Sequence, residues 1–310
     1  MKKTLSVLLV CALILGMLMI TACSSSEKKG DKAAVDETNL SFSTVADVKG
    51  SGTAYEFAEN RGVEDDMIVC TIKKDASGEL TIPAKYDDKT VIALISEDKT
   101  NEGVTSLTVE DGVSYIDSCF AESSKALAAL SLPESLTGIY QSFNKCEALN
   151  ALSTPSGLKD LSNSFCDCAN LAKVETTSYL HDLTGSFNNT PKLADVTIGG
   201  SIQKLESSFN KCGLTALSFT ENVHGISDSF NDCPALASIT LDQIAGSVSK
   251  AFVKCPKLTT LTYKQGGERI GYSFNDNALL EKVDFGGGVG NIFNSFQNCP
   301  KYKLPETPAE

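Results

Sequence analysis

A phenylalanine returns at nearly constant intervals along most of the chain. It occupies positions 120, 143, 165, 187, 209, 230, 252, 274 and 296, at intervals of 23, 22, 22, 22, 21, 22, 22 and 22 residues. A period of this length is typical of repeat proteins, in which one unit cannot bury its own apolar face and only the stack is stable. The chain is therefore predicted to fold as a solenoid, each turn of which is called a rung below.

Other apolar residues keep step with the phenylalanines. The unit is Leu-x-x-Leu-x-Leu, about seven variable residues, an aliphatic residue, three residues, and Phe-Asn-x-Cys. The first leucine always precedes its phenylalanine by 16 residues, and the two irregular rungs change length only between Phe120 and Leu127 and between Phe209 and Leu214. An added residue reverses the faces of a strand but is tolerated in a turn, so the strand is placed on Leu-x-x-Leu-x-Leu.

The tolerant turn is then Phe-x-x-Cys-x-x-Leu, whose apolar residues at spacings of three suit a short 3₁₀-like turn. The expected fold is a solenoid of about 22 residues per rung. It has a parallel β-strand face, with short 3₁₀ or irregular turns on the opposite side.

This unit resembles the leucine-rich repeats of the BspA-like and Treponema type, found in exported bacterial proteins. Residues 130–133 (Leu-Ser-Leu-Pro) and 143–146 (Phe-Asn-Lys-Cys) lie close to that pattern, and the likeness covers about residues 80–310. The sequence departs from the family in having serine before most phenylalanines and in losing the proline after the strand beyond Pro155. The resemblance implies adhesion or binding at the cell surface through a non-catalytic strand face, with no particular ligand.

The segment before the repeats has the pattern of an exported lipoprotein. Lys2 and Lys3 precede an apolar run from Leu5 to Ile20, and the following Thr21-Ala22-Cys23 completes a segment that resembles a bacterial lipobox. The alternative is an ordinary signal peptide with a chance cysteine. We expect the chain to be exported, facing outside, and held on the bacterial membrane only through lipid on Cys23.

The sequence predicts four parts. Residues 1–22 are expected to form a lipoprotein signal peptide, 23–53 a lipidated flexible tether of polar composition, 54–100 an irregular N-terminal cap with the first turns, and 101–310 the leucine-rich repeat solenoid.

Charge and motifs exclude several functions. The chain has 27 basic and 39 acidic residues, and removing 1–22 with Lys2 and Lys3 leaves 25 minus 39, or −14. Such a surface repels phosphate backbones, so nucleic acid is not an expected partner. The sequence contains no nucleophile elbow, phosphate loop, histidine-rich metal motif or calcium loop, so we expect no enzyme activity, cofactor or metal.

Two polar rows of the turns have alternative interpretations. Six cysteines lie three residues after a phenylalanine, and they suit either redox or metal chemistry or, as we favour, packing inside the turn: Cys146, Cys168, Cys212, Cys233, Cys255 and Cys299. Amides directly after the phenylalanine suit either ligand binding or, as we favour, backbone hydrogen bonding: Asn144, Asn188, Asn210, Asn231, Asn275 and Gln297. His181 and His224 lie two rungs apart, about 10 Å, which is too far for one metal.

The candidate binding surface is the outward side of the strands. It comprises Lys173, Glu175, Asp195, Thr197, Ser218, Ser238, Thr240, Thr260, Thr262, Lys282 and Asp284. An ordinary solvated sheet face is the alternative. Because the chain has no Trp to stack on a sugar, a glycan ligand is only weakly indicated. The main hypothesis is therefore a protein partner from the host or the bacterial envelope, and the alternative is a scaffolding module without a ligand site.

The third apolar position of the strand is uneven. Thr154 and Thr176 stand where other rungs carry Leu, Ile, Phe or Tyr. If these threonines point inward, their hydroxyls need partners, since an unpaired buried hydroxyl costs about 1 to 3 kcal/mol. The second and third rungs are therefore predicted to be the least stable part of the stack.

Overall fold

The structure is a computed structural model that describes residues 35–303 except 52, 54, 61, 177–178, 267–268 and 286–290. All of these residues belong to one compact unit, Val35–Glu310. The predicted signal peptide, Cys23 and the first part of the predicted tether lie outside the described residues. Within the described part, no helix is long and apolar enough to cross a membrane.

Regular structure begins earlier than the sequence predicted. Strand β1 (Leu40–Thr44) and helix α1 (Val45–Gly50) fall in the range expected for the tether. Thr44 caps α1, because its hydroxyl accepts a hydrogen bond from the Asp47 backbone N–H at 3.2 Å while the Asp47 carboxylate accepts one from the Thr44 backbone N–H at 3.1 Å. Leu40 and Val45 are buried, so a few apolar residues suffice to fold a segment whose average composition is polar.

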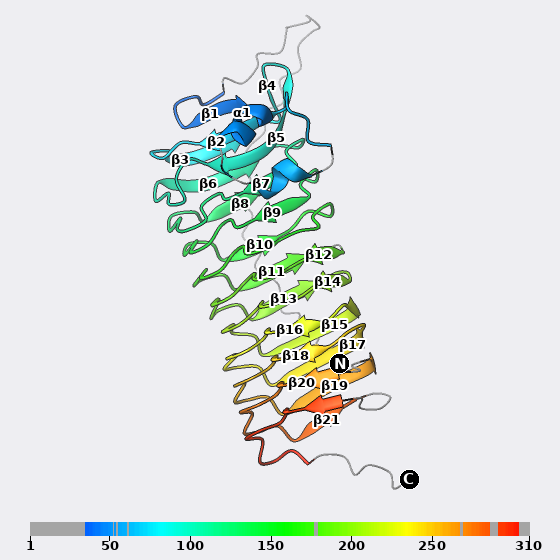
Figure 1. Cartoon of the computed structure of the whole chain (residues 1–310). Helices are drawn as coiled ribbons and strands as arrows, with labels where there is room; N and C mark the ends of the chain where they lie inside the picture. Colours follow the sequence, from blue (N-terminus) through cyan, green and yellow to red (C-terminus); the bar gives the residue numbers. More distant parts are fainter. Residues whose placement is uncertain are drawn as a thin grey trace, which may run out of the picture. The chain divides into compact units, whose positions relative to one another are not determined.

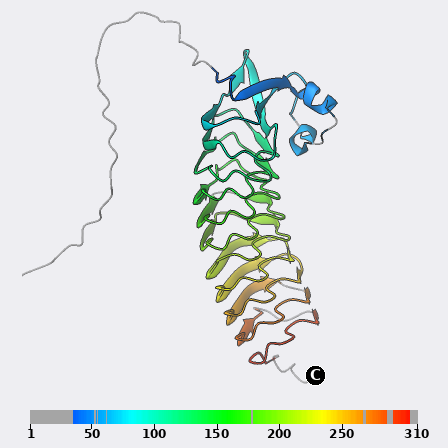
Figure 2. The ribbon, with the colours of Figure 1, turned by 90° about the vertical axis from the view of Figure 1, so that its left-hand side faces the viewer.

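The first turns are covered by these elements. Strand β1 pairs antiparallel with β2 (Ile68–Ile72), and β2 pairs parallel with β5 (Lys89–Ser96), which carries the short hairpin partner β4 (Lys85–Tyr86). Helix α1 and the 3₁₀ helix η1 (Glu56–Glu59) lie beside the first turns in Figure 2. Their residues Val45, Val48 and Phe57 form a second apolar cluster apart from the main core.

The predicted strand face is confirmed, and we call it the front sheet. Its strands are β3 (Gly78–Ile82), β6 (Val104–Val109), β8 (Ala129–Ser131), β10 (Ala151–Ser153), β11 (Lys173–Thr176), β13 (Asp195–Ile198), β15 (Ala216–Val223), β17 (Ser238–Ile244), β19 (Thr260–Gly266) and β21 (Lys282–Asp284). They form three ladders, β3-β6-β8, β10-β11-β13 and β15-β17-β19-β21. Within each ladder, neighbours are parallel and in register, as in Lys173↔Asp195 and Ser238↔Thr260, and all strands follow the chain order along the stack in Figure 1. The rungs are therefore turns of a parallel β-solenoid.

A second set of strands, the back sheet, was not predicted. Besides β5 it comprises β7 (Tyr115–Asp117), β9 (Gly138–Tyr140), β12 (Leu180–Asp182), β14 (Ile202–Lys204), β16 (Ile226–Ser227), β18 (Val248–Ser249), β20 (Arg269–Gly271) and β22 (Asn291–Phe293). Each strand after β5 is only two or three residues long. Most of these strands contain the aliphatic residue four before the phenylalanine, whereas β12 and β14 end one residue before it. A single apolar residue in so short a strand gives no alternation that sequence reasoning can detect.

The phenylalanines form a continuous ladder through the core. From Phe143 to Phe296, successive ring centroids lie 5.2 to 5.8 Å apart with interplanar angles of 22° or less. This spacing is close to the distance between adjacent strands, about 4.8 Å, so each ring stacks on its neighbour. The rings from Phe120 to Phe274 are fully buried, and Phe296 at the last described rung is half-buried.

The predicted turn Phe-x-x-Cys-x-x-Leu is irregular in its first part, from the phenylalanine to the cysteine, and 3₁₀-like only in its second part. All nine phenylalanines have φ between 53° and 66°, and the residue two before each of them also has positive φ. A 3₁₀ turn needs negative φ throughout. Only the following Cys-x-x-Leu closes an i→i+3 bond, for example from the Leu171 N–H to the Cys168 carbonyl at 3.1 Å. At the rung that lacks one residue stands Gly213, where an added Cβ would collide with the Pro191 carbonyl.

Candidate binding surfaces

The structure places the predicted front-face residues on the outside of β11, β13, β15, β17, β19 and β21. Glu175, Ser238, Thr240 and Thr262 are half-buried, and the other seven are exposed. They alternate with apolar residues that point inward, such as Val174, Ile239 and Leu261, because successive side chains of a strand face opposite sides. The sequence therefore identified correctly which side chains face solvent on this sheet.

These residues fall into two groups. Lys173, Glu175, Asp195 and Thr197 come together on the paired strands β11 and β13. The seven others lie on the ladder β15-β17-β19-β21, and no pairing joins β13 to β15 within the described ranges. The first group carries three charges, whereas the second carries hydroxyls with Lys282 and Asp284 at its end.

The charges on the front face are loosely paired. The Lys173 ammonium lies 3.3 Å from the Glu175 carboxylate, and the Lys282 ammonium lies 3.8 Å from the Asp284 carboxylate. Both pairs are solvent-exposed, so each contributes about 0 to 1 kcal/mol to the free energy of unfolding. Each pair can therefore be exchanged for contacts with a partner at little cost in stability.

The threonines at the third apolar position point inward, as the sequence suggested. Thr154 and Thr176 are 4 % and 2 % exposed. The Thr176 hydroxyl donates to the Thr197 carbonyl at 3.5 Å, whereas the Thr154 hydroxyl finds no partner among the described residues. The cost of burying an unpaired hydroxyl therefore falls on the rung of Thr154.

We predict that Thr154→Val raises the free energy of unfolding by about 1 kcal/mol, because valine has the shape of threonine without the unpaired hydroxyl. Urea titration followed by circular dichroism measures the change. Thr176→Val is the matched control and should give no gain, because it removes a hydroxyl that has a partner. Equal effects of the two substitutions would contradict the assignment.

Serine before the phenylalanine bonds the backbone of the turn. The buried Ser142 hydroxyl accepts from the Cys119 N–H at 3.0 Å and donates to the Tyr140 carbonyl at 2.6 Å. Ser273 repeats this arrangement with the Ala251 N–H at 3.2 Å and the Gly271 carbonyl at 3.1 Å. Sequence reasoning noted these serines only as a departure from the family, although their regular spacing was the available signal.

Asparagine after the phenylalanine links successive rungs, which confirms the structural interpretation of this row. The Asn231 side-chain oxygen accepts from the Val253 N–H at 2.8 Å, and its amide donates to the Lys250 carbonyl at 2.9 Å. Asn144, Asn188, Asn210 and Asn275 also join the next rung in this way, and Gln297 lies at the same position of the last described rung.

The repeated cysteine is a buried hydrogen-bond donor. The thiols of Cys168, Cys212, Cys233, Cys255 and Cys299 donate to the carbonyl of the phenylalanine one rung earlier, at 3.2, 3.1, 3.2, 3.1 and 2.9 Å. Where the cysteine is replaced, Asn277 donates to the Phe252 carbonyl at 2.7 Å and Thr190 to the Phe187 carbonyl at 2.7 Å. The position therefore selects a small donor, and this supports the packing interpretation.

The chemistry of these thiols fits that role. All nine cysteines in the described part of the chain are free. Burial raises the pKa of Cys212 to about 12 and that of Cys166 to about 11, which suppresses the reactive thiolate form of these two residues. His181 lies 3.2 Å from the Asp160 carboxylate, and no cluster suited to a metal occurs among the described residues.

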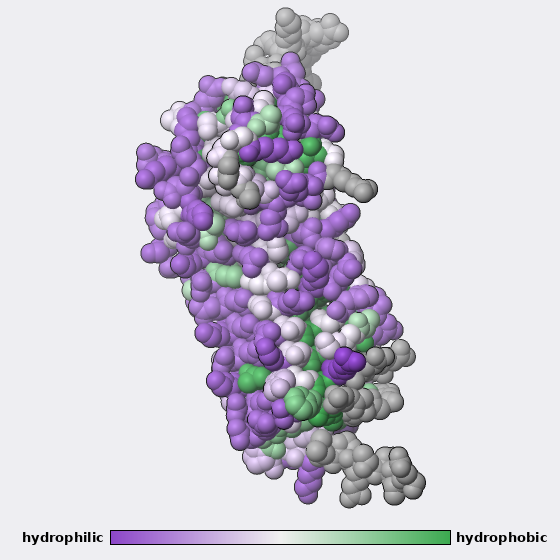
Figure 3. All heavy atoms as spheres, in the orientation of Figure 1, coloured by the Kyte–Doolittle hydropathy of each residue, from purple (hydrophilic) through white to green (hydrophobic). Residues whose placement is uncertain are grey.

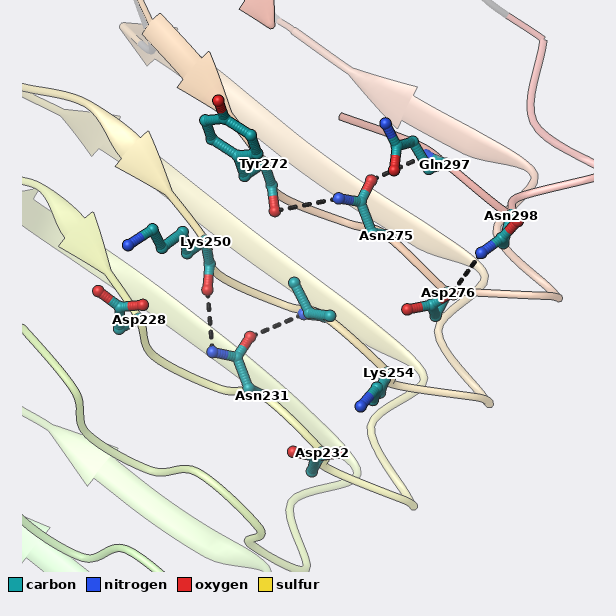
Figure 4. Close-up of a pocket in the computed structure, with 11 residues that line it drawn as sticks. Asp228, Asn231, Asp232, Lys250, Lys254, Tyr272, Asn275, Asp276, Gln297 and Asn298 are labelled. Atoms are coloured by element: carbon teal, nitrogen blue, oxygen red, sulfur yellow. Dashed lines mark hydrogen bonds between the residues drawn. The ribbon is translucent and has the colours of Figure 1, made fainter. Parts of the chain in front are cut away.

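The turns also carry a polar groove that sequence reasoning missed. A hollow of about 340 Å³ is lined by residues that include Asp228, Asn231, Lys250 and Tyr272, and a neighbouring one of about 500 Å³ by residues that include Lys211. The two hollows share Asp228, Asn231 and Asp232, so we treat them as one turn groove. In Figure 4, Asp228, Lys250 and Tyr272 lie on one side of the asparagines, and Asp232, Lys254 and Asp276 on the other.

Exposed aromatic residues occur away from the front sheet. Tyr179, Tyr272 and Phe293 are 45 %, 47 % and 53 % exposed, and Tyr272 meets Phe293 edge to face with centroids 5.4 Å apart. The face drawn in Figure 3 is mostly hydrophilic, with hydrophobic colour in a narrow strip over its lower half and in small patches nearer its top. The surface thus offers few apolar anchors.

The stacked parallel strands, the apolar ladder and the rung of about 22 residues define a leucine-rich repeat solenoid. The family profile described as BspA type Leucine rich repeat region matches residues 99–208 and 184–303 with six copies. These matches cover more than half of the 310 residues, so the chain belongs to the BspA-type leucine-rich repeat family.

Solved structures with a similar arrangement come from several bacteria. A leucine-rich repeat protein from Bacteroides ovatus has 16% identity and a TM-score of 0.40, with 80% of this chain and 79% of that chain covered. The T. pallidum leucine-rich repeat protein has 16% identity and a TM-score of 0.34, covering 74% and 88%. A leucine rich cell surface protein from Faecalibacterium prausnitzii has 14% identity and a TM-score of 0.33, covering 71% and 73%. No curated protein matches the sequence.

Proposed function

We propose that the chain is an exported, lipid-anchored surface protein whose solenoid binds a protein partner, from the host or the envelope, through the front sheet. The binding is non-catalytic. The observation that carries the proposal is the arrangement of the front face. Its outward residues stand in register within each of the two ladders, and two exposed ion pairs, Lys173–Glu175 and Lys282–Asp284, lie at the ends of a row of hydroxyl side chains. Repeat proteins commonly use such an extended face for binding.

The different roles of the turn and strand side chains within each rung support this choice of face. The serine, asparagine and cysteine side chains of the turns are engaged in backbone hydrogen bonds. The outward side chains of β11 to β21 are exposed or partly exposed and vary from rung to rung, from Lys173 to Ser238 to Lys282. A partner can therefore be recognised there by side chains whose replacement leaves the stack intact.

We predict that replacing Lys173, Glu175, Asp195 and Lys282 together by alanine weakens binding of the partner by about tenfold or more, because polar contacts at an interface centre carry affinity. The partner is sought by screening the chain against extracellular-matrix proteins, mucins and a glycan array at physiological salt. The variant is then measured against the best saturable hit.

The matched control replaces Lys49, Asp65, Lys99 and Glu122, two exposed pairs outside the front-face set. The control should bind as the natural chain does, and both variants should unfold at the natural temperature. A hit that survives in the four-site variant would remove the front face from the proposal. No hit on any surface would favour the alternative, an envelope scaffold without a ligand site.

For the anchor, we predict that the chain incorporates radiolabelled palmitate in a bacterial host and that Cys23→Ser abolishes the label. Lipid is attached to the thiol of the lipobox cysteine, which serine lacks. An unlabelled natural chain that is nevertheless exported would establish the ordinary signal peptide instead.

A further inference from the structure

We propose that two copies of this chain associate through the turn groove, related by a two-fold axis that runs between the rungs of Phe230 and Phe252. The partner surface is a second copy of the same groove. This association is independent of the front sheet, so it stands whether or not the proposed protein partner exists.

The first observation is the order of charges along one wall of the groove. From the rung of Phe187 to that of Phe296, the residue two after the phenylalanine is, in successive rungs, Asn189, Lys211, Asp232, Lys254, Asp276 and Asn298. When this row is laid against its own reverse, Lys211 meets Asp276 and Asp232 meets Lys254. A two-fold axis produces this reversal, because it brings the same patch of both copies together in opposite directions, an isologous interface.

The opposite wall carries a second row with the same symmetry. The residue two before the phenylalanine is Asp228 in the rung of Phe230 and Lys250 in the rung of Phe252. The axis that pairs Asp232 with Lys254 therefore also brings Asp228 opposite Lys250. Each copy presents one acidic rung and one basic rung to the other, as the side chains in Figure 4 show for one copy.

These charges are open to a partner. Lys211, Asp232, Lys250, Lys254 and Asp276 are exposed, and Asp228 is half-buried. None of the six has an ion-pair partner within 4.0 Å among the described residues, although opposite charges lie on adjacent rungs. On the back sheet, by contrast, Lys204 pairs with Asp182 of the preceding rung at 3.2 Å. The alternating charges of the groove are thus not neutralised by ion pairs within one chain.

The hydrogen bonds made by two of the carboxylates do not compensate their charge. Asp228 accepts from the Ser227 hydroxyl at 3.2 Å, and Asp276 accepts from the Asn298 amide at 2.6 Å. Both donors are neutral. The six charges also sum to zero, in a chain with net charge −12. The groove itself therefore adds no net repulsion when two acidic copies approach each other through it.

The size of the turn groove indicates how strong the dimer should be. Six rungs at about 4.8 Å span roughly 29 Å, and a strip of this length and a few residues in width is smaller than a standard interface. The dimer should therefore be weak, and it should dissociate when added salt screens its exposed ion pairs. Weak association of this kind is best detected at low ionic strength.

The test uses charge exchange in the full chain, kept in non-denaturing detergent and carrying two different tags. The first variant is Asp228→Lys with Asp232→Lys, and the second is Lys250→Asp with Lys254→Asp. Sedimentation and co-purification of the two tags measure self-association at low and high salt. Circular dichroism and urea unfolding check that each variant folds as the natural chain does.

We expect the natural chain to self-associate at low salt, and each variant alone to do so at least about tenfold more weakly, because like charges then face each other across the axis. An equimolar mixture of the two variants should associate again, and so should the chain that carries all four substitutions. The first variant is less acidic than the natural chain, so general repulsion cannot explain its loss.

Three results would overturn the proposal. The first is a natural chain that stays monomeric at low salt up to about 100 μM, a concentration at which a dimer with a micromolar dissociation constant would form. The second is that each variant alone associates as strongly as the natural chain, which would place the contact elsewhere. The third is that the mixture and the fourfold variant do not recover self-association although both fold, which would exclude the two-fold pairing of these rungs.

Discussion

The turn that begins at each phenylalanine is the constraint on which the rest of the structure depends. To place the ring in the core, the backbone adopts positive φ at the phenylalanine and two residues before it. Such a backbone cannot continue a regular strand, so some of its N–H and carbonyl groups need other partners. Serine, asparagine and cysteine side chains supply them. Ser273 and Asn231 accept from the N–H groups of Ala251 and Val253, on either side of Phe252, and Cys255 donates to the carbonyl of Phe230 one rung earlier.

This arrangement explains why the rungs tolerate so much variation elsewhere. Because Asn231 bonds both Val253 and Lys250 of the next rung, each turn is tied to its neighbour by side chains as well as by the backbone. The front sheet then needs only its inward residues for stability. Its outward residues, from Lys173 to Asp284, can therefore differ from rung to rung. The charged side chains of the turn groove are likewise not needed to hold the stack together, and they stay exposed.

The period, the strand and the inward or outward direction of its side chains could be predicted from the sequence, because the length of the segment from leucine to phenylalanine never changes. The buried threonines and the backbone role of Asn231 followed from the same reasoning. The back sheet could not be predicted, since strands such as β16 and β18 contain two residues each and show no alternation. The left-handed phenylalanine was also missed, because bulky residues rarely adopt positive φ.

The candidate site was predicted only in part. Alternation on a strand identifies exposed residues such as Lys173 and Thr240, but it carries no information on which strands pair, and the interruption between β13 and β15 had no signal in the sequence. The turn groove was missed because its two walls, such as Asp228 and Asp232, come together only once the turn geometry is known. The early start of the fold at Leu40 was hidden by the polar residues around it.

The account is tested most directly by removing one asparagine of the ladder and measuring the free energy of unfolding in urea. We expect Asn231→Ala to lower it by about 1 to 3 kcal/mol, because the Val253 N–H and the Lys250 carbonyl both lose their partner. Hydrogen exchange at the Val253 amide should also become faster, whereas Lys257→Ala, at an exposed lysine outside the turn groove, should change neither quantity. Unchanged stability and unchanged exchange in the asparagine variant would contradict the claim that these side chains hold the rungs together.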